Sequence, residues 1–291
     1  MSGVGPVLAQ TRQEGRAAVV GYLPVGYPDV ATSIAAMCAM VEGGVDIVEV
    51  GVPYSDPLMD GPVIQHAGEV ALAAGARTRD VFTAVRAIVD AGAPALVMTY
   101  WNPVERYGVS RFATDLAAAG GAGLITPDLI PDEADEWLAA AQANDLDRVF
   151  LIAPSSTPAR LAATARACRG FVYAASTMGV TGVRASVGDT ARVLVQRAKD
   201  VTDLPVCVGL GVSTGAQAAE VGAFADGVIV GSALVRCLTD ADSLAAGVDA
   251  VRALSAELAA GVRSATRPVH STASEPVAST TTSAKSANVS T

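Results

Sequence analysis

Two carboxylates lie close together in the sequence, in a setting that favours proton-transfer chemistry. Glu49 falls inside the apolar run 45–50, and Asp60 follows in a loop rich in proline, glycine and small residues. Because burial disfavours the charged form of a carboxyl group, we expect the pKa of Glu49 to rise toward neutrality, which suits proton exchange with a substrate. The alternatives are structural: Glu49 would pair with a buried Arg or Lys, and Asp60 would cap a helix beginning at Pro62.

Counting the residues leaves few other catalytic groups. The chain has two histidines, His66 and His270, and four cysteines that lie far apart without a CxxC pair. We therefore expect neither a histidine-based triad nor a metal site. Carboxylates, tyrosines and backbone amides remain as the groups that can do chemistry.

The overall charge argues against two classes of partner. The formal net charge is −9 and no basic run occurs, so we expect binding to neither nucleic acid nor an anionic membrane. No stretch approaches the ~18 consecutive apolar residues of a membrane span. The first residues lack the basic-then-apolar order of a signal peptide, which favours a cytoplasmic protein.

The elements that must position the two carboxylates recur along the chain. Eight short apolar runs without alternation are typical of parallel strands covered on both faces; they are 18–23, 45–50, 95–100, 123–125, 149–152, 171–174, 205–208 and 227–230. Helix-period segments separate them, with two after the second run, around 62–74 and 78–91. This order predicts a single-domain (β/α)₈ TIM barrel with extra helices. An open doubly wound sheet is disfavoured, because GYLPVGYPD after the first run is no dinucleotide-binding fingerprint.

We divide the chain into three parts on this basis. Residues 1–15 form an N-terminal segment or helix, and residues 16–265 form the catalytic barrel. Residues 266–291 are rich in Ser, Thr and Ala and contain no aromatic residue, so we predict a disordered tail.

Glycines at the ends of the last three predicted strands suggest a phosphate site. The loops 176–182, 209–213 and 231–233 each carry glycine, which lets backbone amides approach an anion closely. Tight turns also need glycine, but all three loops fall at the end of the barrel where active sites form. The last two loops hold no Lys or Arg, so the cradle would be neutral, built from amides and the hydroxyls of Thr181 and Ser232. Arg184 flanks the first loop and is assigned to the surface.

At this point the residues carry a recognisable pattern. The stretch IVEVGVPYSDPLMDGPVIQ closely resembles the signature of tryptophan synthase alpha chains, and GFVYAASTMGVTGVR, GLGVS and VIVGSALV resemble the family's late loops. The resemblance covers roughly residues 16–265. It implies retro-aldol cleavage of indole-3-glycerol phosphate into indole and glyceraldehyde 3-phosphate. By the same resemblance, Glu49 would be the acid/base and Asp60 would accept the indole N–H.

The resemblance also assigns the remaining pocket. Residues implied to line the site or hold the phosphate are Tyr22, Tyr173, Thr181, Gly182, Gly209, Gly211, Gly231 and Ser232. Tyr22 stands where the family often has Phe, and Tyr27 stands in GYP where many members have Asp. These departures affect pocket details and partner contacts rather than the carboxylate pair.

The family further implies an α₂β₂ assembly. A beta subunit carrying pyridoxal phosphate would receive indole, and this chain would need no cofactor of its own. Two alternatives remain open at this stage. Another phosphate-sugar barrel, an isomerase or epimerase, would usually need a metal set or a second base. A catalytically silent regulatory subunit would be expected to lack Glu49 or Asp60.

Overall fold

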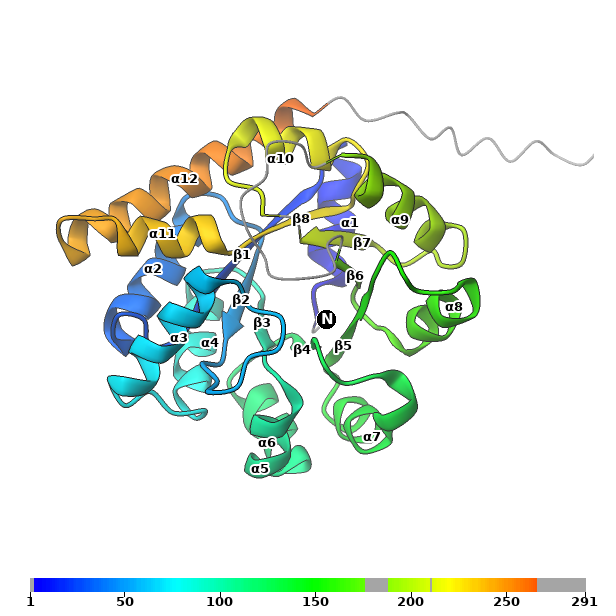
Figure 1. The fold of residues 1–291 in the computed structure, drawn as a ribbon, viewed down its shortest axis with the longest axis horizontal. Helices are drawn as coiled ribbons and strands as arrows, with labels where there is room; N and C mark the ends of the chain where they lie inside the picture. The colour runs from blue at the N-terminus through cyan, green and yellow to red at the C-terminus, as the bar shows by residue number, and fades with distance from the viewer. Residues whose placement is uncertain (1–2, 176–187, 210, 266–291) are drawn as a thin grey trace, which may run out of the picture.

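The apolar runs form the strands of one closed parallel barrel. The computed structural model describes residues 3–175, 188–209 and 211–265. Each strand pairs in parallel with the next, and the last closes on the first (Figure 1). The strands are β1 (Ala18–Pro24), β2 (Ile47–Gly51), β3 (Ala95–Met98), β4 (Gly123–Thr126), β5 (Asp147–Ile152), β6 (Val172–Ala175), β7 (Val206–Gly209) and β8 (Gly227–Val230). The predicted (β/α)₈ barrel is therefore confirmed.

Helices surround the barrel as a ring (Figure 1). They are α1 (Gly5–Gln13), α2 (Val30–Glu42), α3 (Pro62–Ala73), α4 (Asp80–Asp90), α5 (Trp101–Tyr107), α6 (Val109–Ala118), the 3₁₀ turn η1 (Pro131–Glu133), α7 (Asp135–Ala143), α8 (Pro158–Ala167), α9 (Asp189–Lys199), α10 (Gly215–Gly222), α11 (Ser232–Thr239) and α12 (Leu244–Ser264). The predicted pair after the second strand appears as α3 and α4. None of the helices in the described ranges is long and apolar enough to cross a membrane.

A second helix pair follows β3, where the sequence did not indicate one. The third strand was predicted to continue to Tyr100, but it ends at Met98 and Tyr100 is already the N-cap of α5. Helices α5 and α6 are separate because Gly108 between them has φ of +97°, a conformation that glycine adopts without steric cost.

Because side chains alternate between the two faces of each strand, the protein has two hydrophobic cores. One core lies between the barrel and the helices, and the other fills the barrel interior with side chains from alternate strand positions, among them Val20, Ile47, Leu96, Ile125, Phe171 and Ile229. Because successive side chains of a strand point to opposite faces, Ile47 fixes the direction of Glu49 two residues later. Glu49 therefore points into the barrel.

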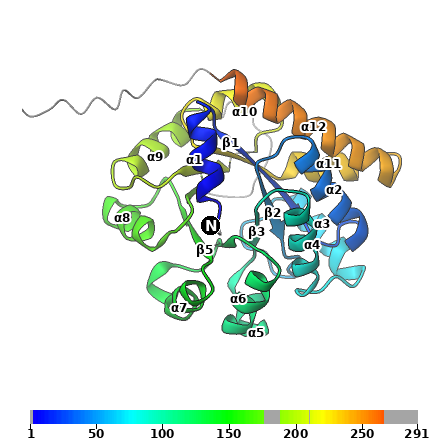
Figure 2. The same cartoon turned by 180° about the vertical axis from the view of Figure 1, so that it is seen from behind.

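Helix α1 closes one end of the barrel (Figure 2). Its N-cap residue Val4 and its Leu8 belong to the interior core. The Val4 N–H donates to the buried Asp147 carboxylate at the start of β5, with N to Oδ2 at 2.8 Å, and Arg169 lies 3.1 Å from the same carboxylate. With this end plugged by α1, the pocket forms at the opposite, C-terminal end of the strands.

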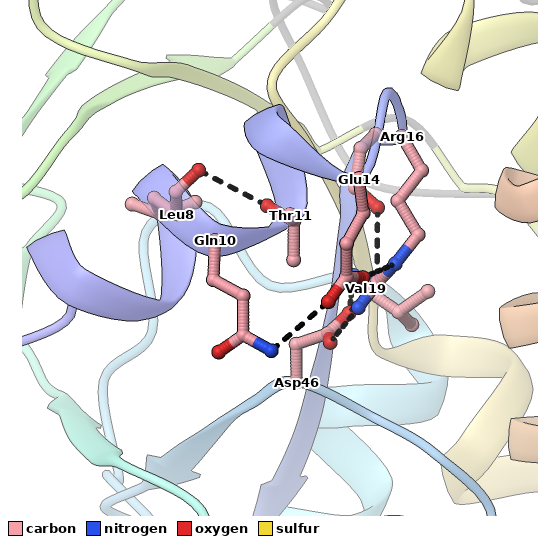
Figure 3. A network of polar contacts seen from close by, with 8 residues as sticks. Leu8, Gln10, Thr11, Glu14, Arg16, Val19 and Asp46 are labelled. Carbon is pink, nitrogen blue, oxygen red and sulfur yellow. Dashed lines mark hydrogen bonds and ion pairs between the residues drawn. The ribbon is translucent and has the colours of Figure 1, made fainter.

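An ion pair at the plugged end ties the chain after α1 to the first two strands (Figure 3). Both Arg16 Nη atoms donate to the Asp46 carboxylate at 2.8 Å, and Asp46 also accepts the Val19 N–H at 2.8 Å. The two charged side chains are only 11% and 12% exposed. Asp46 therefore serves the stability end of the barrel, as its place just before β2 indicated.

This geometry makes Asp46 a stability residue without a catalytic role. We predict that Asp46→Ala lowers the free energy of unfolding by about 3 kcal/mol, because it removes the acceptor of both Arg16 Nη atoms and of the Val19 N–H. Arg16 then keeps only the more exposed Glu14 as a carboxylate partner. The pocket at the opposite end of the barrel should not be affected. Denaturant unfolding of the full chain measures the effect, with Asp132→Ala as control, since the Asp132–Arg160 pair is exposed and should leave stability unchanged within error. Equal effects of the two variants would contradict this assignment.

Candidate active site

One pocket at the C-terminal ends of the strands contains every predicted site residue that the structure describes. Its walls are largely apolar and aromatic, and among described residues they include no Lys or Arg. The lining residues are Tyr22, Glu49, Met59, Asp60, Ile64, Met98, Tyr100, Pro127, Leu151, Tyr173, Ala175, Gly209, Gly211, Ile229, Gly231 and Ser232. Thr181 and Gly182 were also predicted to bind substrate; they lie outside the described residues, as do Arg184 and the tail 266–291.

Glu49 is buried in this pocket without a partner among the described residues. Its side chain is 0% exposed, and neither carboxyl oxygen has a hydrogen-bond partner there. The structural alternative of a buried Arg or Lys partner is therefore wrong for the part of the chain that is described. Burial alone raises the pKa of Glu49 to about 8. The group is protonated at neutral pH yet close enough to its pKa to give up and recover a proton.

Two tyrosines lie beside Glu49, each fitted against a glycine of the neighbouring strand. Tyr22 of β1 is the register partner of Glu49, and a Cβ atom at Gly51 would overlap its hydroxyl end. A Cβ atom at Gly209 would likewise overlap the hydroxyl of Tyr173 on β6. Burial raises the pKa of both tyrosines, with Glu49 and Asp60 contributing in the same direction. Both hydroxyls are thus protonated and can donate hydrogen bonds.

Asp60 lies on the loop between β2 and α3. Its backbone carbonyl accepts a hydrogen bond from Gln65 Nε2 at 2.8 Å. The N-cap of α3 is Gly61 and no side chain caps this helix, so the capping alternative for Asp60 is wrong. Burial raises the pKa of Asp60, and a hydrogen bond from the Tyr100 hydroxyl lowers it. Its carboxylate is a second acid group in the same pocket, in a more polar setting than Glu49.

The N-terminus of α11 lies at the pocket wall. Gly231 is the N-cap, no side chain caps the helix, and Ser232 is its first residue. The free first-turn amides and the helix dipole favour an anion at this position. Gly211, also in the wall, has φ of +65°, which favours glycine. Gly209 has a second reason to be glycine, because Tyr173 lies against it.

The structure adds Tyr100 to the pocket, where the sequence did not predict it, and places Tyr27 outside the pocket. Tyr100 lines the pocket, and its only signal was an aromatic residue at the end of a predicted strand. Tyr27 does not line the pocket; its hydroxyl is hydrogen-bonded to Thr239 of α11 at 2.8 Å. Among the described residues, no group of three or more His, Cys, Asp or Glu side chains could hold a metal ion.

Comparisons with known proteins point to one family. The family model described as "Tryptophan synthase alpha chain" matches residues 8–263. The tryptophan synthase alpha chain of Mycobacterium intracellulare is 64% identical over 262 residues, which is 90% of this chain and 95% of the relative. That of Salinispora arenicola is 63% identical over 270 residues, covering 93% of this chain and 100% of the relative. A solved structure of Mycobacterium tuberculosis tryptophan synthase matches with a TM-score of 0.85 and 64% identity, covering 90% of this chain and 98% of the solved chain.

The raised pKa of Glu49 has a consequence for stability. The folded state keeps this proton up to a pH of about 8, whereas the unfolded chain releases it near 4.5. The stabilising contribution of the neutral carboxyl is therefore complete below pH 4.5 and is lost as pH rises through 8. We predict that the stability advantage of Glu49→Gln over the wild type grows across this window by about 4 kcal/mol. Denaturant unfolding at pH 4.5, 6 and 8 tests this, and a constant difference would contradict it.

Proposed function

The chain belongs to the tryptophan synthase alpha chain family, and we propose that Glu49 and Asp60 carry out the reaction of this family here. The reaction is the cleavage of indole-3-glycerol phosphate to indole and glyceraldehyde 3-phosphate, which makes the protein a carbon–carbon lyase of tryptophan biosynthesis. The observation that carries the residue assignment is that Glu49, without a hydrogen-bond partner in the described part of the chain, lies in one pocket with Asp60.

Glu49 would act first as an acid and then as a base. Its neutral carboxyl donates a proton to indole C3, which turns the ring system into the N-protonated indolenine cation. The resulting carboxylate then takes the proton of the glycerol hydroxyl next to C3. The bond between indole C3 and the carbon that carries this hydroxyl then breaks. The hydroxyl-bearing carbon becomes the aldehyde of glyceraldehyde 3-phosphate, and the electron pair of the broken bond returns to the indole ring. Glu49 ends as it began, and a pKa of about 8 suits both directions of transfer.

Asp60 would hold the other side of the ring. An ionised carboxylate accepts the indole N–H and stabilises the positive charge that develops on nitrogen when C3 is protonated. This role needs the charged form of Asp60 while Glu49 is neutral. The two environments favour this division, because the Tyr100 hydroxyl donates to Asp60 and nothing in the described chain donates to Glu49.

We assign the phosphate to the N-terminus of α11. The amides of Gly231 and Ser232, with Gly209 and Gly211 at the end of the neighbouring strand β7, give a neutral cradle for a dianion. Tyr22 and Tyr173 would line the space between this cradle and the carboxylates. Thr181 and Gly182 remain predicted members of the cradle from the loop that lies outside the described residues.

We further propose that the chain works in an α₂β₂ complex whose beta subunit binds pyridoxal phosphate. Indole is neutral and small, so a docked partner would keep it from diffusing away. Exposed apolar side chains support a docking surface beside the pocket: Leu58 is 76% exposed on the β2–α3 loop, and Ile130 lies on the loop after β4. Pyridoxal phosphate needs a lysine, and the only described lysine, Lys199, pairs with Asp226 outside the pocket lining.

The same biosynthetic role suggests where the protein works. We propose a cytoplasmic location, because tryptophan made from the released indole is used there for protein synthesis.

The acid–base assignment is tested by removing each carboxylate. We predict that Glu49→Gln lowers the rate of indole release by 10²- to 10⁴-fold, within the ~10²–10⁴ range of general acid–base catalysis. Asp60→Ala should lower kcat/KM by about 10²-fold, roughly 3 kcal/mol. Neither variant should change the affinity for glycerol 3-phosphate, which probes the cradle alone.

Asp56→Asn is the matched control, since Asp56 is exposed on the same loop and its one hydrogen bond among the described residues is to Ser55. It should turn over normally. Normal turnover in Glu49→Gln would overturn the acid/base role. A large loss of glycerol 3-phosphate affinity in Asp60→Ala would move that residue to the phosphate end.

The partner proposal is tested by changing the exposed apolar loop. We predict that Leu58→Asp weakens binding to a tryptophan synthase beta subunit by about tenfold or more, because it places a charge in an apolar contact. Val193→Asp on α9, a residue 57% exposed and away from the pocket, should bind as the wild type does. Sedimentation of mixtures with the beta subunit measures both affinity and mass. Unchanged binding by Leu58→Asp would exclude this loop from the docking surface.

A further inference from the structure

The hydroxyl of Tyr100 lies between two successive residues of the loop that carries Asp60. Its oxygen accepts the Met59 N–H at 2.9 Å, and the hydroxyl is close enough to the Asp60 carboxylate to lower the pKa of that acid. Tyr100 follows β3 and is 5% exposed, while Met59 and Asp60 come from the loop after β2. One hydroxyl thus links the ends of two neighbouring strands across the pocket.

The loop is held mainly by side chains, and its backbone makes few hydrogen bonds of its own. After Val52, whose N–H donates to Met98, no backbone–backbone hydrogen bond of residues 53–60 is found among the described residues. Side chains from outside the loop do this work instead: Tyr100 binds at Met59 and Asp60, and Gln65 binds the Asp60 carbonyl. Since Leu58 and Met59 are exposed, burial does not fix these two residues either.

Tyr100 itself is held firmly. Its ring packs against Tyr54 with centroids 5.4 Å apart, and the Tyr54 hydroxyl accepts a hydrogen bond from Asn102 at 3.0 Å. The next backbone amide, that of Trp101, donates to Asp128 at 2.9 Å. Because Tyr54 belongs to the same loop, its contacts with Tyr100 and Asn102 tie the loop to the end of β3 at a second point. The burial of Tyr100 and the bond of the Trp101 amide hold the tyrosine from outside the loop.

The charges around Asp60 make a donor at this position valuable. The titratable groups of the described chain that line the pocket with Asp60 are Tyr22 of β1, Glu49 of β2, Tyr100 after β3 and Tyr173 of β6, and none of them is a cation. Only Tyr100 opposes the effect of burial on the pKa of Asp60. Burial raises the pKa of Tyr100 to about 12, so the hydroxyl keeps its proton at neutral pH.

We propose that Tyr100 is a positioning residue for Asp60: its hydroxyl holds the β2–α3 loop in the pocket through Met59 and presents the Asp60 carboxylate, in its charged form, to the indole N–H. The inference rests on the proposed role of Asp60. It adds a residue that touches the loop and acts on the reaction through Asp60.

The test is Tyr100→Phe, which removes one oxygen atom and keeps the ring against Tyr54. Indole release from indole-3-glycerol phosphate is measured as a function of pH for Tyr100→Phe, Asp60→Asn and the double variant, all in the full chain. We expect kcat of Tyr100→Phe to fall tenfold or more while KM changes less than threefold, because the cradle at α11 is untouched. The acid limb of its kcat profile should move to higher pH, since the interaction that lowers the pKa of Asp60 is gone. The double variant should be no slower than Asp60→Asn.

Tyr107→Phe is the matched control. It also removes a tyrosine hydroxyl bound to a carboxylate, that of Asp115 at 2.6 Å, away from the pocket. It should keep the wild-type kcat and pH profile. Hydrogen exchange of the Met59 amide gives a readout independent of activity, and it should speed up about tenfold or more in Tyr100→Phe only.

The outcomes separate the two proposals. A wild-type kcat and pH profile in Tyr100→Phe, together with a slow Asp60→Asn, overturns the positioning role and leaves the function of Asp60 standing. Independent, multiplying losses in the double variant also overturn it, because Tyr100 would then act without Asp60. Wild-type turnover in Asp60→Asn overturns the proposed role of Asp60 itself.

Discussion

The active site depends on one unfavourable burial, that of the Glu49 carboxyl. An acid group 0% exposed, without a hydrogen-bond partner in the described chain, is held there only because β2 is fixed on both sides by the ladders to β1 and β3. The strand cannot slip by one residue without turning Ile47 out of the barrel core. The apolar register therefore enforces the position of the acid, and the position raises its pKa to about 8.

The barrel divides its charges between its two ends. At the end closed by α1, the acids are satisfied: Asp46 pairs with Arg16, and Asp147 accepts the Val4 N–H and pairs with Arg169. At the open end, no described residue bonds to Glu49, and the neutral Tyr100 hydroxyl is the only described group that lowers the pKa of Asp60. The paired acids hold the fold together, whereas the unpaired ones keep the reactivity that pairing would suppress.

Glycine and tyrosine shape the pocket together. Tyr22 reaches over Gly51, and Tyr173 reaches over Gly209, so each ring takes the space of a missing side chain on the next strand. This fit brings both hydroxyls to the level of Glu49 while the walls remain largely apolar. The contact with Tyr173 also explains, independently of phosphate binding, why residue 209 is glycine. The proposed phosphate site then rests chiefly on the first turn of α11 beside Gly231, where no side chain caps the helix.

The sequence by itself determined the barrel, the inward direction of Glu49 and the family, because strand period, glycine placement and the motif around Asp60 are local signals. It misplaced strand ends where long-range pairing decides them. Val45, predicted as strand, donates its N–H to the end of α2, and Tyr100 begins a helix.

Only the tertiary structure decided which groups touch. It removed the capping role of Asp60, moved Tyr27 out of the pocket and brought Tyr100 to the loop of Asp60, 40 residues away in the chain. Contacts of this kind depend on how neighbouring strands and their loops meet in space, and no local spacing in the chain encodes them.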